Sequence, residues 1–128
     1  MSSYPNDLKY TNDHEWLRAQ GANWRVGITQ FAVDQLGDIT LVDLPKEHDL
    51  VTKGQRFGTI ESVKSVSDLY APISGRVVRV NAALRASPEL VNQEPYAGGW
   101  MIEIEPTERG EVDGLMTHDA YVKLVENA

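Results

Sequence analysis

The sequence predicts a mainly β fold in which short strands pack as a sandwich or a flattened barrel. Three observations predict it. Short runs rich in β-branched residues recur between turn residues along most of the chain. The segment 100–105 alternates, with Trp100, Ile102 and Ile104 on one face and glutamates on the other. Helical patterns are few and short, and a chain of 128 residues is expected to form one domain over residues 1–128.

The first elements form a hairpin followed by a short helix. Segments 14–18 and 24–28 have the pattern of strands, and the turn residues 20–23 join them. Thr29 is a helix-capping residue, and Gly37 stands where a left-handed terminating residue belongs. The sequence therefore predicts one or two helical turns between these two residues.

The middle of the chain consists of further strands. Segment 38–44 is β-branched and stops at Pro45, which cannot donate to a sheet ladder. Strands are also expected over 57–63, 67–70 and 75–80.

Two helices are expected in the last third of the chain. A single turn over 88–91 has Pro88 at its first position. After the capping residue Thr117, apolar residues at helical spacing, such as Tyr121, predict a C-terminal helix over 117–126. Its apolar stripe is expected to pack over an open end of the sheets.

Lys64 stands alone at the apex of the hairpin predicted from strands 57–63 and 67–70. Gly54 and Gly75 each open an apolar strand on either side of it, so two similar half-units would meet at this tip. A lysine there exposes an amine that another enzyme could acylate. Most surface lysines carry no modification, so this pattern alone leaves an unmodified lysine open.

The composition narrows the class of protein. The 12 basic and 19 acidic residues give a net charge of −7, which disfavours nucleic acid and anionic membranes and favours partners with basic docking faces. Without cysteine, the chain has no disulfide, thiolate nucleophile or Cys-based metal site. His14 has no second histidine four residues on, so no metal site is expected.

The N-terminal residues lack the pattern of a secretory or transit peptide, and no apolar run reaches the roughly 18 residues of a membrane span. We therefore expect a soluble protein of the bacterial cytoplasm rather than the mitochondrial matrix.

A set of short motifs, in this order, covers most of the chain. They are Tyr10, His14-Glu15-Trp16, Gly27-Ile28-Thr29, Leu36-Gly37-Asp38, Val42-Asp43-Leu44-Pro45, Glu61-Ser62-Val63-Lys64, Ala71-Pro72-Ile73-Ser74-Gly75, Val80-Asn81, Leu84, Pro88-Glu89-Leu90-Val91-Asn92, Pro95-Tyr96 and Gly99-Trp100-Met101. With them the chain resembles the H proteins of the glycine cleavage system, which are lipoyl carriers. The tetrapeptide ending at Lys64 differs from the Asp-Lys-Ala usual in lipoyl domains of 2-oxo acid dehydrogenases and from the Met-Lys-Met of biotin carriers.

The resemblance implies a hybrid barrel-sandwich of the lipoyl/biotinyl-carrier type, with short helices and a C-terminal helix. It implies a carrier protein that has no catalytic residues of its own and on which separate enzymes act. Lipoate would be joined covalently to Lys64 by a lipoate ligase or a lipoyl/octanoyl transferase. The arm would take an aminomethyl group from glycine decarboxylase (P protein) to aminomethyltransferase (T protein) and then present dihydrolipoyl to dihydrolipoamide dehydrogenase (L protein). A monomer is expected.

The resemblance also suggests roles for three carboxylates. Glu15 and Asp68 would line a cleft that shelters the loaded arm, although they could equally be ordinary solvated acids. Glu61 would belong to the recognition surface for the modifying enzyme or be a solvated strand residue. Two departures from the family pattern are Gln35, where several relatives carry a histidine, and the loop 46–49, which lacks the glycine many relatives have there.

Two other functions remain open. The chain could be a lipoyl donor that passes its lipoyl group to other lipoyl domains in protein lipoylation. It could also be a β-sandwich interaction domain whose Lys64 is never modified.

Overall fold

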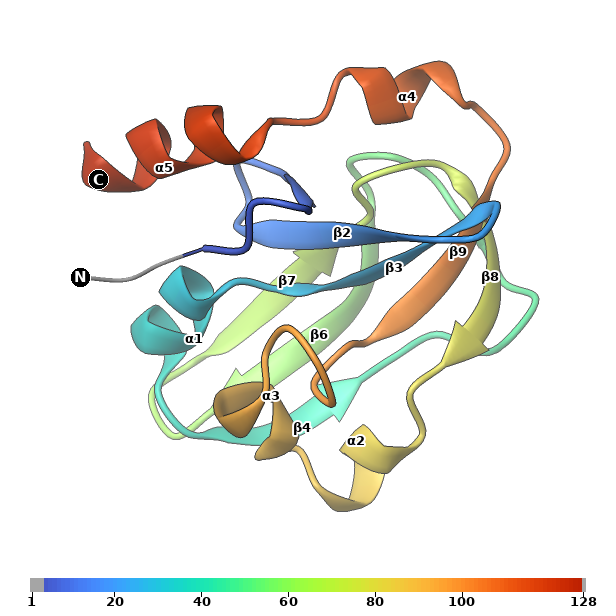
Figure 1. Cartoon of the computed structure of the whole chain (residues 1–128). Helices are drawn as coiled ribbons and strands as arrows, with labels where there is room; N and C mark the ends of the chain where they lie inside the picture. Colours follow the sequence, from blue (N-terminus) through green and yellow to red (C-terminus); the bar gives the residue numbers. More distant parts are fainter. Residues whose placement is uncertain (1–3, 128) are drawn as a thin grey trace.

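Two antiparallel sheets face each other in the computed structural model, which describes residues 4–127 (Figure 1). The six-stranded sheet has the order β1-β2-β3-β9-β8-β5, and the three-stranded sheet has the order β4-β6-β7. The strands are β1 (Lys9–Tyr10), β2 (Glu15–Gln20), β3 (Asn23–Ile28), β4 (Ile39–Asp43), β5 (Leu50–Val51), β6 (Arg56–Ser62), β7 (Val66–Tyr70), β8 (Gly75–Val80) and β9 (Ile102–Pro106). This arrangement is the predicted mainly β barrel-sandwich.

Five short helices connect or cover the strands. They are α1 (Gln30–Leu36), α2 (Ala83–Ala86), α3 (Leu90–Gln93), α4 (Gly110–Asp113) and α5 (His118–Glu126). The predicted caps of two of them are confirmed, because the Thr29 side chain accepts from the Ala32 N–H and the Thr117 side chain accepts from the Ala120 N–H. Gly37 ends α1 with a φ of 80°, as expected for a left-handed terminating residue.

The main core lies between the two sheets. Both sheets and helices α1 to α3 contribute buried apolar side chains to it, among them Leu17, Val26, Val33, Ile60, Leu69, Val77, Leu84, Val91, Ile102 and Ile104. Alternate residues of each strand supply this layer, so burial of apolar area holds the two sheets together.

A second cluster is mostly aromatic and fixes the C-terminal helix. Tyr121 of α5 is fully buried and stacks on Tyr10 of β1, with 4.5 Å between the ring centroids. Tyr4 meets Tyr121 edge-on, and Trp16 completes the cluster. The predicted stripe of α5 thus packs beside the outermost strand of the larger sheet, as Figure 1 shows.

Three sequence predictions differ from the structure. The strand expected over 100–105 begins only at Ile102, and Trp100 before it is half-buried rather than a core residue. Glu103 is 5% exposed instead of facing solvent, because Arg25 and Asn23 of the neighbouring strand hydrogen-bond its carboxylate. The turn expected over 88–91 is helical at Leu90–Gln93, after Pro88.

The loop that departs from the family pattern contains a strained residue. His48 has a φ of 78°, in the left-handed region that glycine adopts without strain. The backbone at His48 therefore has a conformation that favours glycine.

Among residues 4–127, no helix combines the length and the apolar character that crossing a membrane requires.

Candidate functional site

The turn between β6 and β7 carries Lys64 and is fixed by hydrogen bonds of its own residues. The Ser62 N–H donates to the Ser65 carbonyl over 2.8 Å, and the Ser62 Oγ accepts from the N–H groups of Lys64 and Ser65, each over 3.2 Å. The Val63 N–H donates to the Asp38 carbonyl over 3.0 Å, which ties the turn to the start of β4. None of these bonds involves the lysine side chain, so the turn holds its shape whatever the amine carries.

The Lys64 side chain is exposed and lies along Gly37. A Cβ built on Gly37 would be 3.3 Å from Lys64 Cε. No ion pair to Lys64 forms within the part of the chain that the structure describes. Its neighbours Val63 and Val66 are 67% and 65% exposed, so the amine projects from an apolar tip. An amine in this position is open to a modifying enzyme.

Glu61 lies one strand residue before the turn and is half-buried. It is paired with Val66 on β7 and with Leu41 on β4. It also lines a cavity of about 650 Å³ whose other walls include Pro45, Asn81 and Arg85. Glu61 is therefore a groove residue close to the tip, which suits contact with an enzyme that approaches Lys64.

Glu15 is buried, with 2% of its surface exposed, beside a cavity of about 560 Å³. The Thr11 hydroxyl donates to Glu15 Oε1 over 3.4 Å, and the backbone of Tyr70 lies beside the carboxyl. Burial raises the pKa of Glu15 well above its ordinary value, and the charge of Asp13 raises it further. A nearby cation would stabilise the charged form of this carboxyl.

We expect Glu15→Gln to become more stable relative to the parent as pH rises. The folded-state pKa of Glu15 is raised above 4.5, so the stability tied to its neutral form is complete below 4.5 and is lost as pH rises through the folded pKa. Glutamine keeps the neutral form at every pH. Free energies of unfolding in urea, measured for both proteins from about pH 5 to about pH 8, test this. A stability difference that does not change with pH would contradict it.

Asp68 lies elsewhere, on the exposed face of β7. It forms an ion pair with Arg56 over 3.8 Å and accepts from the Tyr70 hydroxyl over 3.4 Å. Both partners of the ion pair are largely exposed, so it contributes little stability. The structure does not bring Asp68 into the cavity that Glu15 lines. The two carboxylates are connected only through Tyr70, which contacts each of them.

His14 serves the aromatic cluster. Its Nδ1 is 2.9 Å from the Tyr121 hydroxyl, and its ring lies 4.4 Å from that of Phe31. Burial lowers the pKa of His14. In the described residues, no three His, Asp or Glu side chains gather as metal ligands. Gln35 is exposed on α1.

Sequence reasoning missed the residues that hold the tip. Ser62 is the first residue of the turn, where serine is typical, and this signal could have identified its role. Gly37 and Asp38 were expected only as the end of α1 and the start of a strand. Their contact with the lysine turn had no signal in the sequence, because it joins segments far apart along the chain.

Two antiparallel sheets that present an exposed lysine at a hairpin tip are the arrangement expected of a carrier protein of the lipoyl/biotinyl class. Comparison with known proteins gives the family. Residues 8–128 match the family model "Glycine cleavage H-protein". The chain belongs to the glycine cleavage H-protein family.

Its relatives match over nearly their full length. The glycine cleavage system H protein of Myxococcus xanthus (strain DK1622) is 52% identical over 124 residues, which cover 97% of this chain and 96% of that protein. The H protein of Listeria monocytogenes serotype 4a (strain HCC23) is 50% identical over 97% of this chain and 99% of its own. The crystal structure of an H protein from Mycobacterium marinum superimposes with a TM-score of 0.84 at 41% identity, covering 94% of this chain and 97% of that one.

Proposed function

We propose that this chain is the lipoyl carrier of the glycine cleavage system, with lipoate joined as an amide to Lys64 Nζ. It carries the aminomethyl group from glycine decarboxylase to aminomethyltransferase and then presents dihydrolipoyl to dihydrolipoamide dehydrogenase. The observation that carries the proposal is the exposed Lys64 amine on a turn that Ser62 and Asp38 fix through the backbone. Because the turn is fixed, the full length of the arm is available for reaching an active site.

Lys64 fits the group chemically. A primary amine forms an amide with a carboxylic acid, and the apolar tip of Val63 and Val66 offers a surface for an enzyme to grip. Lipoate would supply a disulfide that opens as it accepts the aminomethyl group, one sulfur taking that group and the other becoming a thiol. The lysine and lipoate together form a chain of about a dozen bonds, which reaches on the order of 15 Å from the backbone.

We further propose which enzyme modifies the carrier, in which oligomeric state it acts and where. A lipoate ligase or a lipoyl/octanoyl transferase modifies Lys64, and Glu61 belongs to the surface which that enzyme recognises. The chain acts as one carrier domain over residues 1–128, as a monomer, in the bacterial cytoplasm. The family membership and the bacterial relatives support this setting.

We also propose that Asp68 and Glu15 shelter the loaded arm. From Val66 to Tyr70 the strand β7 rises about 13 Å. An arm laid along β7 therefore passes Asp68 and ends near Tyr70, whose backbone lies beside Glu15. The aminomethyl group is a cation, and a buried carboxylate beside it would hold the ammonium and exclude water.

We expect Glu15→Gln and Asp68→Asn to shorten the lifetime of the loaded arm without reducing lipoylation. Each change replaces a carboxyl group, which can become charged beside the ammonium, by a neutral amide of the same size. Loss of one charge-assisted hydrogen bond should speed hydrolysis by about tenfold for the buried Glu15 and less for the exposed Asp68. Formaldehyde release from carrier loaded with aminomethyl groups measures this. Asp113→Asn, an exposed acid on α4, is the control, and release at the parent rate from all three variants would refute the shelter.

The proposed function is tested by intact mass and by reconstitution. Protein expressed in a lipoate-proficient host should gain the mass of one lipoyl group, and Lys64→Arg should not. An unchanged parent mass would favour an interaction domain with an unmodified lysine. Reconstituted glycine decarboxylation then separates the carrier from a lipoyl donor, since a dedicated donor would support none.

A further inference from the structure

A group of arginines lies on the outer face of the six-stranded sheet. Arg18 on β2 is directly opposite Arg25 on β3, Arg25 is opposite Glu103 on β9, and Glu103 is opposite Arg79 on β8. Residues directly opposite in a sheet point to the same side, so these side chains form one row. Arg76, opposite Glu105, extends it along β8. We call Arg18, Arg25, Arg76 and Arg79 the arginine face.

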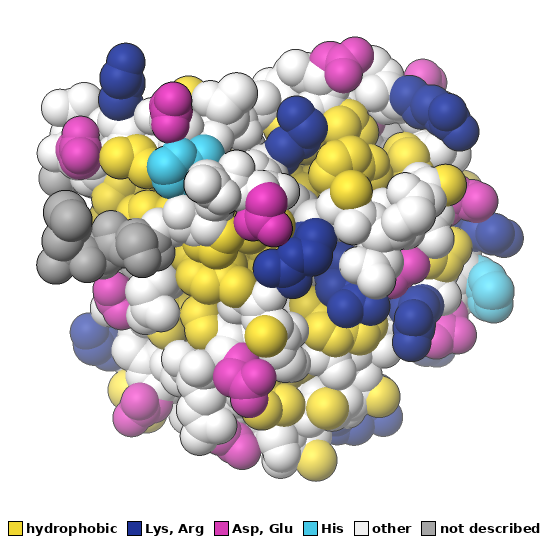
Figure 2. Space-filling model, in the orientation of Figure 1, with side chains coloured by type: hydrophobic (Ala, Val, Ile, Leu, Met, Phe, Trp, Pro, Cys, Tyr) yellow, Lys and Arg dark blue, Asp and Glu magenta, His cyan; other side chains and the backbone are white. Residues whose placement is uncertain are grey.

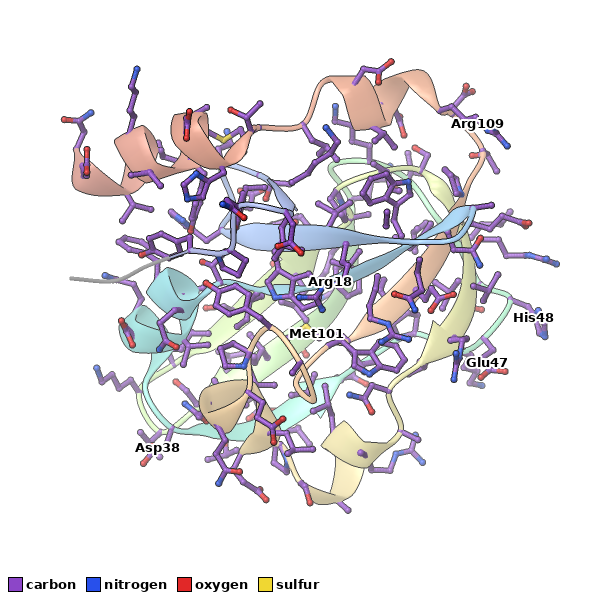
Figure 3. The ribbon with its side chains drawn as sticks, in the orientation of Figure 1. Arg18, Asp38, Glu47, His48, Met101 and Arg109 are labelled. Carbon is purple, nitrogen blue, oxygen red and sulfur yellow. The ribbon has the colours of Figure 1, made fainter. Side chains whose placement is uncertain are left out.

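The pictures agree with this pairing. Figure 2 shows Lys and Arg side chains gathered near the middle of the face that Figure 1 views, where β2 and β3 run side by side. In Figure 3, Arg18 lies at this place, in front of the sheet. The chain as a whole has a net charge of −7, so this positively charged patch is opposite in sign to the protein as a whole.

The carboxylates within the row do not neutralise it. Glu103 is buried and takes its ion pair from Arg25, over 3.4 Å. Arg79, on the other side of Glu103, is exposed and has no ion pair among residues 4–127. Within the described part of the chain, Arg18 donates to the Tyr96 carbonyl alone, over 2.7 Å. Arg76 pairs with Glu105 over 3.3 Å, and both are about half exposed. The arginine face therefore keeps an excess of positive charge.

The sheet holds two of these charges in an unfavourable position. Arg18 and Arg25 are directly opposite each other, and like charges so placed destabilise a sheet. Each guanidinium is held over an indole ring, Arg18 at 5.0 Å from the Trp16 centroid and Arg25 at 4.4 Å from that of Trp100. The rings limit where the guanidinium groups lie, so less side-chain entropy is lost when an anion binds.

We propose that the arginine face docks an acidic, extended segment of one of the enzymes that the carrier visits. This inference rests on the proposed function. Guanidinium groups recognise carboxylates through paired hydrogen bonds, and Glu103 already sits between two members of the row. Neighbouring strands are about 4.8 Å apart, and alternate side chains of an extended segment are about 6.7 Å apart, so several carboxylates can reach the row at once. A long polyanion such as nucleic acid would instead be repelled by the net charge.

The position of this face suits a carrier. It belongs to the six-stranded sheet, whereas Lys64 belongs to the three-stranded sheet, so a partner bound here does not cover the hairpin. The net charge alone predicted partners with basic docking faces. The arginine face adds a second contact of the opposite sign, which orients the carrier on an enzyme.

The test compares two double variants with equal charge changes. Arg76→Glu/Arg79→Glu reverses two exposed members of the face, and the control Arg109→Glu/Lys123→Glu reverses two exposed basic residues elsewhere. Intact mass first establishes that each carrier is lipoylated. We then measure KM for carrier with glycine decarboxylase, aminomethyltransferase and dihydrolipoamide dehydrogenase at about 20 mM and about 300 mM salt.

For at least one enzyme at low salt, the first variant should raise KM about tenfold above the control, with kcat unchanged, and high salt should remove most of the difference. Arg76→Gln/Arg79→Gln should give an intermediate KM, which excludes a folding defect. Equal KM values for the two lipoylated double variants with all three enzymes would overturn this inference alone. A KM change that accompanies loss of a carrier dimer in sedimentation would also overturn it. Failure of the parent to be lipoylated would overturn the proposed function and this inference with it.

Discussion

Lys64→Arg is expected to fold like the parent and to lose all carrier activity. The side chain of Lys64 is exposed and forms no ion pair within residues 4–127, and the turn is held by Ser62 and Asp38. Arginine keeps the positive charge. It cannot be acylated, because its guanidinium stays protonated at any pH a protein survives.

The measurement is the rate of glycine cleavage in a system reconstituted with the three enzymes. The rate should fall to that of the mixture without carrier, while the free energy of unfolding changes by less than about 0.5 kcal/mol. Lys123→Arg, an exposed lysine on α5, is the matched control and should cleave glycine at the parent rate. Glycine cleavage by Lys64→Arg above background would refute the assignment of this lysine.

Gly58→Ala should destabilise the sheet that carries the lysine. Gly58 lies on β6, where β4 approaches so closely that a Cβ would overlap the Asp43 carbonyl oxygen. That oxygen belongs to the backbone of a paired strand and cannot turn aside as a flexible side chain would. We expect a loss of about 3 kcal/mol, as for strong overpacking, and a fall in Tm on the order of 10 °C.

Urea unfolding of Gly58→Ala and of a control measures the loss. The control is Gly110→Ala, since a Cβ at Gly110 meets nothing within 4 Å. Alanine there should leave stability within about 0.5 kcal/mol of the parent. If both variants unfold at the parent midpoint, β4 and β6 are not packed as closely as described.

Local signals made much of the fold predictable. Thr29 and Thr117 cap their helices through hydrogen bonds to residues three positions away, and Gly37 ends α1 with its own backbone angle. The lysine hairpin was predictable for the same reason, because its strands are consecutive and serines, at Ser62 and Ser65, stand at its turn. Such interactions lie within a few residues of one another, so the sequence pattern records them.

The faces of the strand in segment 100–105 alternate as predicted, but Glu103 on the outer face is buried for a physical reason. Glu103 belongs to β9, which lies between β3 and β8, and the residues opposite it on both strands are arginines. These arginines are far from Glu103 along the chain, so the local sequence pattern does not reveal them. A period of two predicts that Glu103 faces solvent. Here Arg25 covers Glu103, and Trp100 packs against the Arg25 guanidinium rather than in the core.

By itself, the sequence determined a β fold with capped short helices, a lone lysine at a hairpin tip and, by resemblance, its family. Only the tertiary structure decided that Gly37 and Asp38 lie against the lysine turn, that Glu15 is buried beside a cavity, and that arginines from separate strands meet in one row. The reason is range: a cap or a turn is decided by neighbours along the chain, whereas burial and charge clusters depend on which distant strands pair.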